Sequence, residues 1–163
     1  MTVLLERARQ IKLLVLDVDG VLTDGGLYFG EQGEALKRFH VRDGAGIKAL
    51  VETGIAIAVV SGRHFAGTKK RMAELGVTEV IQAATDKVAS VETLIADRDL
   101  SWQHVCVVCD DTTDLEMMAK AGLSVAVADA HEDVANHAHL CTKKLGGRGA
   151  VRELCDLLLS LHR

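Results

Sequence analysis

The chain has 163 residues, of which 48% are hydrophobic and 26% are charged. These proportions are ordinary for a globular protein and exclude a disordered tail or a fibrous repeat. The length predicts one domain spanning residues 1–163. A net charge of −4 and an aromatic fraction of 3% argue against nucleic-acid binding, which needs a basic face or stacking rings.

No apolar run is long enough to span a membrane, and the first residues lack the pattern of a signal peptide. We therefore expect a cytoplasmic protein with no membrane partner.

Short aliphatic runs alternate with amphipathic stretches along the chain. The aliphatic runs are typical of strands covered on both faces, and we expect them at residues 12–16, 55–60, 78–82, 104–108 and 123–127. The amphipathic stretches predict helices at residues 43–52, 65–75, 86–97, 113–121 and 151–161. This alternation predicts an α/β fold, with a parallel sheet and helices on both of its faces.

One segment interrupts the alternation after the first strand. Residues 27–29 and 35–39 have the pattern of two short strands around Gly30-Glu31-Gln32-Gly33, which predicts a protruding β-hairpin. Its apolar residues Leu27, Tyr28 and Phe29 favour an oligomer interface. The alternative is that they pack against their own domain.

Cys106 and Cys109 form a C-x-x-C pair inside the run HVCVVCDD. A redox pair would begin a helix, and a zinc pair would lie on a turn. This run instead has the pattern of a strand, in which residues three apart point to opposite faces. We therefore predict buried thiols rather than a redox or zinc site.

Polar residues follow the predicted strands, at the sheet edge where ligands bind in open parallel sheets. Asp17 and Asp19 follow the first strand, Ser61 the second and Asp110 the fourth, while Lys87 begins a helix after the third. Carboxylates this close would be forced to protonate unless a cation neutralised them, and Mg²⁺ is the simplest candidate.

The alternative is that the aspartates are turn formers and helix caps, and Asp114 in particular fits a cap. If they form a site, Asp17 can attack a phosphoryl group while Asp19 serves as general acid and base. Ser61 can bond a phosphoryl oxygen, and Lys87 can neutralise developing charge. This set predicts a phosphatase or phosphotransferase.

The stretches LLVLDVDGVLTDG, VVSGR, DK at 86–87 and CDDTTD resemble, in order, the four signature motifs of the haloacid dehalogenase superfamily of phosphatases. Within it, FHVRDGAGIKAL, LSVAVADAH and GGRGAVRELCDLLL are similar to the 3-deoxy-D-manno-octulosonate 8-phosphate (KDO 8-phosphate) phosphatases. The resemblance implies a doubly wound, Rossmann-like fold and a Mg²⁺-dependent homotetramer. It also implies hydrolysis of KDO 8-phosphate through an aspartyl phosphate, in the synthesis of a bacterial lipopolysaccharide sugar.

The same resemblance assigns roles to individual residues. Asp17 is the implied nucleophile and a metal ligand, Asp19 the acid/base and a ligand through its backbone carbonyl, and Asp110 the third ligand. Lys87 and Ser61 contact the phosphoryl group. The implied substrate-binding positions are Asp19, His40, Val41, Arg42, Asp43, Gly44, Arg63, Arg71 and Lys87.

The chain differs from the family pattern at two positions, and the intervals between its motifs bear on whether it has a cap domain. Cys109 stands where the family usually has Gly, and Glu132 where it often has Pro. The intervals between the motifs are too short for a cap domain, which is the C0 arrangement, so we expect the hairpin of one subunit to cover a neighbour's site. The alternatives are a phosphatase for the nine-carbon acid KDN 9-phosphate or sialic acid 9-phosphate, or a non-catalytic oligomerisation module.

A glycine-rich segment, Gly146-Gly147-Arg148-Gly149, precedes the last predicted helix. It could hold a phosphate or carboxylate on its N–H groups, or it could be only a flexible turn into that helix.

Overall fold

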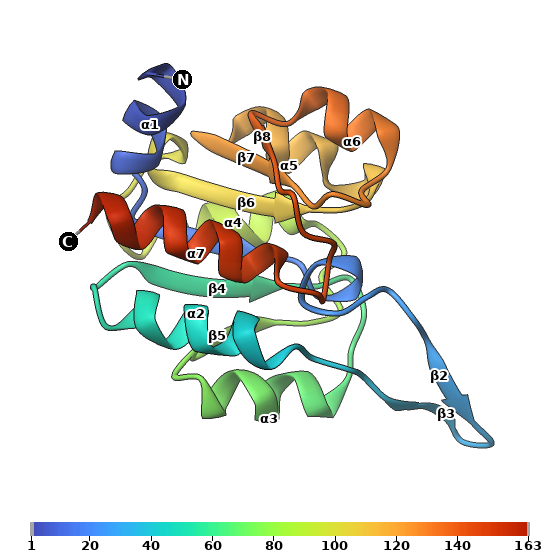
Figure 1. Ribbon diagram of the computed structural model, residues 1–163. Coiled ribbons are helices and arrows are strands. Elements are labelled where there is room, and N and C mark those ends of the chain that lie inside the picture. Colours follow the sequence, from blue (N-terminus) through green and yellow to red (C-terminus); the bar gives the residue numbers. More distant parts are fainter. Residues whose placement is uncertain (1, 163) are drawn as a thin grey trace.

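The computed structural model describes residues 2–162, and the side chains of residues 3–162. Its centre is a six-stranded parallel sheet with the strand order β5-β4-β1-β6-β7-β8. The chain places β4 and β5 on one side of β1 and then returns to place β6, β7 and β8 on the other (Figure 1). The strand bounds are β1 Leu13–Leu16, β4 Ala56–Val60, β5 Glu79–Ile81, β6 Val105–Cys109, β7 Leu123–Ala126 and β8 Leu140–Cys141.

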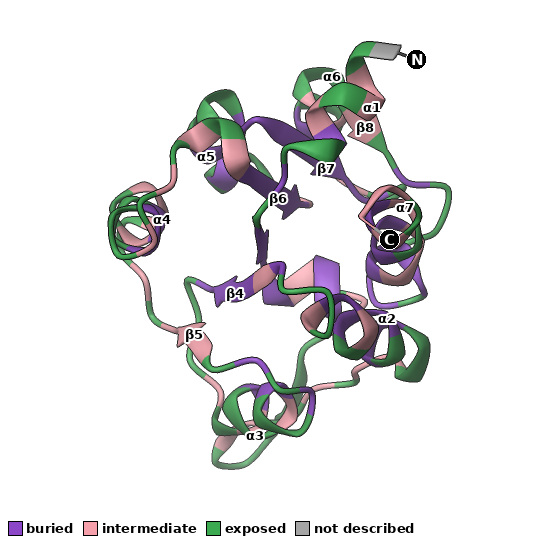
Figure 2. Ribbon diagram, turned by 90° about the vertical axis from the view of Figure 1, so that its left-hand side faces the viewer, coloured by how far each residue is buried: buried purple, intermediate pink, exposed green. Residues whose placement is uncertain are grey.

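Helices cover both faces of this sheet (Figure 2). One face packs against α1 (Thr2–Arg9), α2 (Val41–Val51), α3 (Ala66–Glu74) and α7 (Ala150–Leu161), and the other against α4 (Lys87–Ala96), α5 (Leu115–Lys120) and α6 (Glu132–His137). Side chains of a strand alternate between the faces, so Leu14 and Leu16 join the first core while Leu13 and Val15 join the second. Both cores exclude water, which explains why the strands are aliphatic throughout.

The predicted α/β, Rossmann-like, doubly wound fold is confirmed, and each expected strand and helix of the sheet region has a counterpart with shifted ends. The α-helices α1 and α6 and the strand β8 were not predicted, and neither were the short helical turns over Val18–Leu22 and Trp102–His104. Their sequences are too short or too polar to show a period; β8 has two residues, and in α6 only Val134 is buried.

The hairpin protrudes from the sheet region as predicted (Figure 1). Its strands are β2 (Tyr28–Gly30) and β3 (Gly33–Leu36), which pair antiparallel. The second strand was expected at residues 35–39; it begins earlier because Gly30 pairs directly with Gly33, which leaves only two residues in the turn. Gly33 has a φ of 106°, a conformation that glycine adopts without strain.

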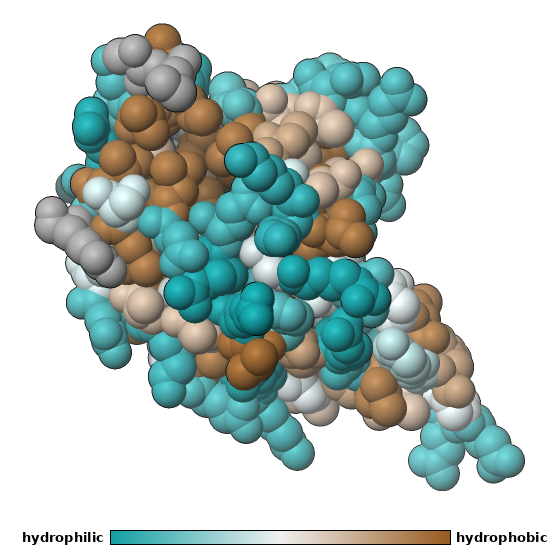
Figure 3. Space-filling view, viewed as in Figure 1, coloured by the Kyte–Doolittle hydropathy of each residue, from teal (hydrophilic) through white to brown (hydrophobic). Residues whose placement is uncertain are grey.

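Apolar side chains of the hairpin are exposed, as Figure 3 shows along its length. Leu27 is 49% exposed, Tyr28 41%, Phe29 66% and Leu36 49%. The alternative in which these residues pack against their own domain is therefore wrong for this chain.

The remaining fold predictions can be checked in the same way. Cys106 and Cys109 are buried, unbridged and on opposite faces of the sheet, as predicted. No cap domain occurs within residues 2–162. None of the described helices has the length and apolar character required to cross a bilayer.

Candidate active site

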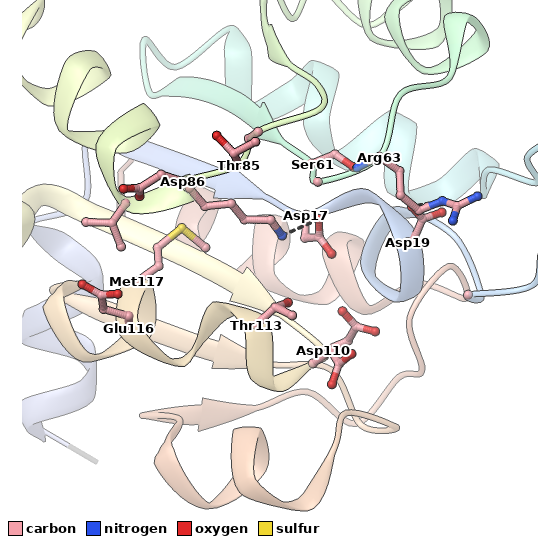
Figure 4. Close-up of a pocket in the computed structure, with 16 residues that line it drawn as sticks. Asp17, Asp19, Ser61, Arg63, Thr85, Asp86, Asp110, Thr113, Glu116 and Met117 are labelled. Atoms are coloured by element: carbon pink, nitrogen blue, oxygen red, sulfur yellow. Dashed lines mark hydrogen bonds and ion pairs between the residues drawn. The ribbon is translucent and has the colours of Figure 1, made fainter.

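A cavity of about 680 Å³ opens at the carboxyl edge of the sheet (Figure 4). It lies where the strand order reverses around β1, the place at which open α/β sheets bind ligands. Leu16 pairs with Val59 of β4 and Val108 of β6, so the loops after all three strands start at one level. The cavity is lined by Asp17, Asp19, Gly25, Ser61, Gly62, Arg63, Ala84, Thr85, Asp86, Lys87, Val88, Asp110, Asp111, Thr113, Glu116 and Met117.

The loop after β1 brings Asp17 against Asp110. The N–H of Asp17 still donates to Val108 O, at 3.3 Å, so this residue extends the strand. A helical turn over Val18–Leu22 follows, and it is interrupted at Gly20, where φ is 87°. A Cβ at Gly20 would lie 1.9 Å from Oδ2 of Asp110, so only glycine lets the two segments approach this closely.

Lys87 links two buried carboxylates at the floor of the cavity. It is the first residue of α4, which Asp86 caps by accepting a 2.9 Å hydrogen bond from the N–H of Ala89. Lys87 Nζ lies 3.0 Å from Asp17 Oδ1 and 2.8 Å from Asp114 Oδ1. Burial lowers the pKa of Lys87, but the two carboxylates raise it more, so the amine stays charged.

Asp114 is a site residue that the sequence placed at this edge but to which it assigned no role in the chemistry. It is 1% exposed, and its side chain makes no capping hydrogen bond at the start of α5. The interpretation of Asp114 as only a cap is therefore wrong, because its carboxylate holds Lys87. The available signal was position: Asp114 lies in the same loop after β6 as Asp110, at the sheet edge where the other site residues meet.

One lysine does not neutralise the carboxylates around it. Burial raises the pKa of Asp17 to about 6, although Lys87 lowers it. Burial, and then the charges of Asp17, Asp111 and Asp114, raise the pKa of Asp110 to about 7. The site therefore has an excess of negative charge in its protein atoms alone.

This excess bears on the predicted Mg²⁺ site. Residues 3–162 contain no group of three His, Cys, Asp or Glu side chains gathered tightly enough to hold an ion by themselves. The predicted set is different, since it comprises the carboxylates of Asp17 and Asp110 with the backbone carbonyl of Asp19. Two carboxylates with unbalanced charge and one carbonyl oxygen, beside space for water, suit Mg²⁺, which keeps several waters when it binds.

Ser61 and Arg63 follow β4 at the same edge (Figure 4). Ser61 is 2% exposed, and its Oγ accepts a 3.3 Å hydrogen bond from the N–H of Arg63. The Arg63 side chain is 44% exposed, and its Nε lies 3.6 Å from Oδ2 of Asp19. The structure thus brings six of the predicted residues to one cavity: Asp17, Asp19, Ser61, Arg63, Lys87 and Asp110.

The other predicted substrate positions do not line this cavity. His40, Asp43, Gly44 and Arg71 surround a separate hollow of about 10 Å³ between α2 and α3. Val41 and Arg42 are exposed at the start of α2. Within one chain these residues are not assembled with the catalytic edge, so their substrate contacts remain a prediction.

Asp43 has a structural role that the sequence did not reveal. It is 1% exposed, and it accepts hydrogen bonds from the N–H of Gly149, at 3.3 Å, and from the N–H of Arg152, at 2.8 Å. These groups belong to the start of α7, so Asp43 caps a helix more than a hundred residues away in the chain.

The glycine-rich segment before α7 packs against the loop after β1. A Cβ at Gly146 would lie 1.7 Å from Gly20 O, and one at Gly147 would lie 2.2 Å from the carbonyl carbon of Thr23. The N–H of Gly146 donates to Asp129 Oδ1 and that of Gly147 to Val21 O, each at 2.8 Å. The N–H groups of this segment therefore bind carboxylates of the chain itself, Asp129 at Gly146 and Asp43 at Gly149, and are not free to bind a phosphate.

Comparisons with known proteins agree with this geometry. A family model described as haloacid dehalogenase-like hydrolase matches residues 75–153. The chain is 46% identical over 155 residues to the 3-deoxy-D-manno-octulosonate 8-phosphate phosphatase KdsC of Yersinia pestis, covering 95% of this chain and 83% of the relative. It is also 46% identical over 153 residues to KdsC of Escherichia coli K12, covering 94% and 81%.

Solved structures give the same result. The crystal structure of the Yersinia pestis phosphatase matches with a TM-score of 0.95 and 44% identity, covering 98% of this chain and 86% of that one. The Moraxella catarrhalis phosphatase, in complex with a magnesium ion, a phosphate ion and a KDO molecule, matches with a TM-score of 0.95 and 35% identity over 99% and 92%. The chain belongs to the 3-deoxy-D-manno-octulosonate 8-phosphate phosphatase family of haloacid dehalogenase-like hydrolases.

Proposed function

We propose that this protein is a Mg²⁺-dependent phosphomonoesterase that converts KDO 8-phosphate to KDO and phosphate. The observation that carries the proposal is the set of Asp17, Lys87 and Asp110 around one cavity at the switch point of the sheet. The Moraxella catarrhalis relative, which holds magnesium, phosphate and KDO together, supports the choice of substrate and metal.

Asp17 is the proposed nucleophile. A carboxylate oxygen of Asp17 attacks the phosphorus, the bond to the sugar oxygen breaks, and an aspartyl phosphate forms. Only the ionised carboxylate can attack, and Lys87, 3.0 Å from Asp17 Oδ1, favours that form. Asp114 keeps Lys87 in place from the opposite side.

Asp19 is the proposed general acid and base. It gives a proton to the departing sugar alkoxide, and it then takes a proton from the water that attacks the aspartyl phosphate. Phosphate leaves and Asp17 is regenerated. Ser61 and Lys87, which both line the cavity, bond the phosphoryl oxygens as charge develops on them.

The residues that would hold Mg²⁺ are Asp17 and Asp110 through their carboxylates and Asp19 through its carbonyl. Bound Mg²⁺ supplies the positive charge that the protein atoms of the site lack, and so balances both the aspartates and the phosphoryl group.

We further propose a homotetramer in which the hairpin of one subunit covers the site of a neighbour. Three observations support it: the cavity is open, the hairpin exposes Leu27, Tyr28 and Phe29, and His40 to Gly44 lie away from the cavity of their own chain. A single domain over residues 1–163, a cytoplasmic location and a role in lipopolysaccharide synthesis belong to the same proposal.

The test is phosphate release from KDO 8-phosphate, with Mg²⁺ and then with EDTA. We expect metal-dependent turnover that falls by about a thousand-fold in Asp17→Asn, because the amide is not a nucleophile. Asp99→Asn is the matched control, since Asp99 is exposed and its φ of 52° suits Asn equally well.

Two results would overturn this assignment: a wild type without metal-dependent release, or full activity in Asp17→Asn. KDN 9-phosphate is assayed beside KDO 8-phosphate. A higher kcat/KM for KDN 9-phosphate would show that the substrate is a nine-carbon acid phosphate instead. A non-catalytic module is disfavoured because such a module needs neither Asp17 nor its buried partner Lys87.

A further inference from the structure

Four charged side chains form a closed ring where the hairpin meets the catalytic edge. Lys37 Nζ bonds Oδ1 of Asp19 and lies 2.6 Å from Oε1 of Glu34. Arg63 completes the ring, with Nη2 3.0 Å from Oε2 of Glu34 and Nε 3.6 Å from Oδ2 of Asp19. Acids and bases alternate around the ring, so its formal charge is zero.

The two halves of the ring differ in exposure. Asp19 and Arg63 line the cavity, and their side chains are 21% and 44% exposed. Glu34 and Lys37 lie behind them, with side chains 9% and 2% exposed. A lysine this buried needs carboxylate partners, and Lys37 has two. Its amine also lies 5.6 Å from the ring centre of Phe65, the residue before α3.

Pairing with Lys37 and Arg63 lowers the pKa of Glu34. Burial acts to raise the pKa of Glu34, but hydrogen bonds from Lys37 and Arg63 lower it further, so the net pKa is below its ordinary value. Glu34 therefore stays ionised and holds both cations.

We propose that Lys37 and Glu34 are positioning residues for the phosphatase reaction, fixing the Asp19 carboxylate and the Arg63 guanidinium at the cavity. The proposal rests on the proposed function, in which Asp19 transfers the proton. Each oxygen of Asp19 faces a different cation, which restricts the carboxylate to one orientation. Proton transfer depends on that orientation, and small misplacements are costly.

The ring also ties the hairpin to the acid/base of its own chain. Glu34 lies in β3 and Lys37 directly follows that strand, so a movement of the hairpin base moves the partners of Asp19. A purely structural ring would anchor the hairpin without affecting proton transfer, and the two roles can be separated by the leaving group of the substrate.

The experiment compares KDO 8-phosphate with p-nitrophenyl phosphate for the variant Lys37→Met. A sugar alkoxide must be protonated as it leaves, whereas p-nitrophenolate leaves without help. Because hydrolysis of the aspartyl phosphate also uses Asp19 and is common to both substrates, the comparison is made on leaving-group release in a single turnover. We expect that rate to fall about tenfold or more for KDO 8-phosphate, while release of p-nitrophenolate changes less than about threefold. Lys37→Arg should restore part of the loss. Lys12→Met, at the exposed amino end of β1, is the matched control.

A second measurement does not depend on activity. The Tm values of Lys37→Met, Asp19→Asn and the double variant form a cycle, and we expect the double variant to lose less than the sum of the single losses. Removing Lys37 leaves two carboxylates, Asp19 and Glu34, with Arg63 as the one remaining cation of the ring, and Asp19→Asn relieves that excess of negative charge. If Lys37→Met does not fold, Glu34→Gln takes its place in both measurements. In the Tm cycle the double variant with Asp19→Asn should then lose more than the sum of the single losses, because Lys37 is left without either carboxylate partner.

Equal losses in leaving-group release from the two substrates in a folded variant, or additive Tm changes, would overturn the positioning role. An inactive wild type would instead overturn the proposed function. The Tm cycle would then be the measurement that decides whether Lys37 and Asp19 are coupled.

Discussion

The carboxyl edge of the sheet and the start of α2 both hold residues that the sequence assigns to the site, but their surroundings differ. At the sheet edge, Asp17, Lys87 and Asp110 face one cavity, and their charges are only partly balanced. At the start of α2, Asp43 is buried, and N–H groups of α7 occupy its carboxylate. The sheet edge has space and unbalanced charge for a ligand, whereas the hydrogen-bonding groups of Asp43 at the start of α2 are already used within the fold.

The difference follows from topology. Parallel strands in register end at the same edge of the sheet. The pairing of the strands alone therefore brings the residues after β1, β4 and β6 together. The start of α2 instead lies on a face of the sheet, against α7 and α3. A single chain therefore brings the predicted groups for phosphoryl transfer together, while the predicted recognition groups around Arg71 lie apart from them, and the proposed tetramer assigns those groups to a neighbouring copy.

After Asp17→Asn, the largest effect is expected at the same sheet edge, from Lys87→Met. The change removes the cation between Asp17 and Asp114, so we expect kcat to fall about a hundred-fold or more for KDO 8-phosphate and p-nitrophenyl phosphate alike. It should also destabilise the fold by about 3 kcal/mol, because two buried carboxylates lose their partner.

The double variant Lys87→Met/Asp114→Asn separates these consequences of losing Lys87. It should recover stability in urea unfolding without recovering kcat. Recovery of activity would show that Lys87 serves only to balance charge.

An intermediate effect is expected at the start of α2, from Arg71→Met. If Arg71 contacts the acidic substrate, KM for KDO 8-phosphate should rise about tenfold while KM for p-nitrophenyl phosphate stays the same. Arg9→Met, on the exposed face of α1, is the matched control.

A mixing experiment shows whose site Arg71 serves. Subunits carrying Arg71→Met and subunits carrying Asp17→Asn are mixed, exchanged and checked for assembly by sedimentation. If Arg71 acts on a neighbour, mixed oligomers contain sites with both residues intact, and activity on KDO 8-phosphate should exceed that of either variant alone. Unchanged activity in verified mixed oligomers would show that Arg71 does not act across the interface.

The sequence allowed the sheet to be predicted because strands buried on both faces must be aliphatic, and a run such as IAIAVV has few other interpretations. The convergence of Asp17, Ser61 and Asp110 followed from the same strands. By contrast, β8 pairs through two residues only and has no pattern to detect.

The partners of the site residues could not be predicted, because each depends on contacts between distant segments. In the sequence, Lys37 resembles any lysine that follows a short strand. Only the folded structure shows that the hairpin places it against Asp19. Asp43 resembles an ordinary first-turn acid of α2, yet its partners are the N–H groups at the start of α7. Sequence patterns report burial and period, whereas these contacts depend on how the elements pack.

The smallest effect is expected from Asp43→Ala, which should change stability and leave turnover of p-nitrophenyl phosphate unchanged. The variant leaves the N–H groups of Gly149 and Arg152 without their acceptor, at a cost of about 1–3 kcal/mol. Urea unfolding measures the loss, and Asp97→Ala, at an exposed position, is the control.

The pH dependence of that loss shows which force dominates at Asp43. Burial raises the pKa of Asp43 above its ordinary 3.8, against the opposing hydrogen bonds from Arg152 and Gly149 and the charge of His40. A carboxyl whose pKa is higher in the folded state contributes its full stability below the unfolded pKa and loses it as pH rises through the folded pKa. The difference in unfolding free energy between wild type and Asp43→Ala should therefore be largest near pH 4 and should narrow toward pH 7. A difference that widened with pH would mean that the start of α7 stabilises the Asp43 carboxylate more than burial disfavours it.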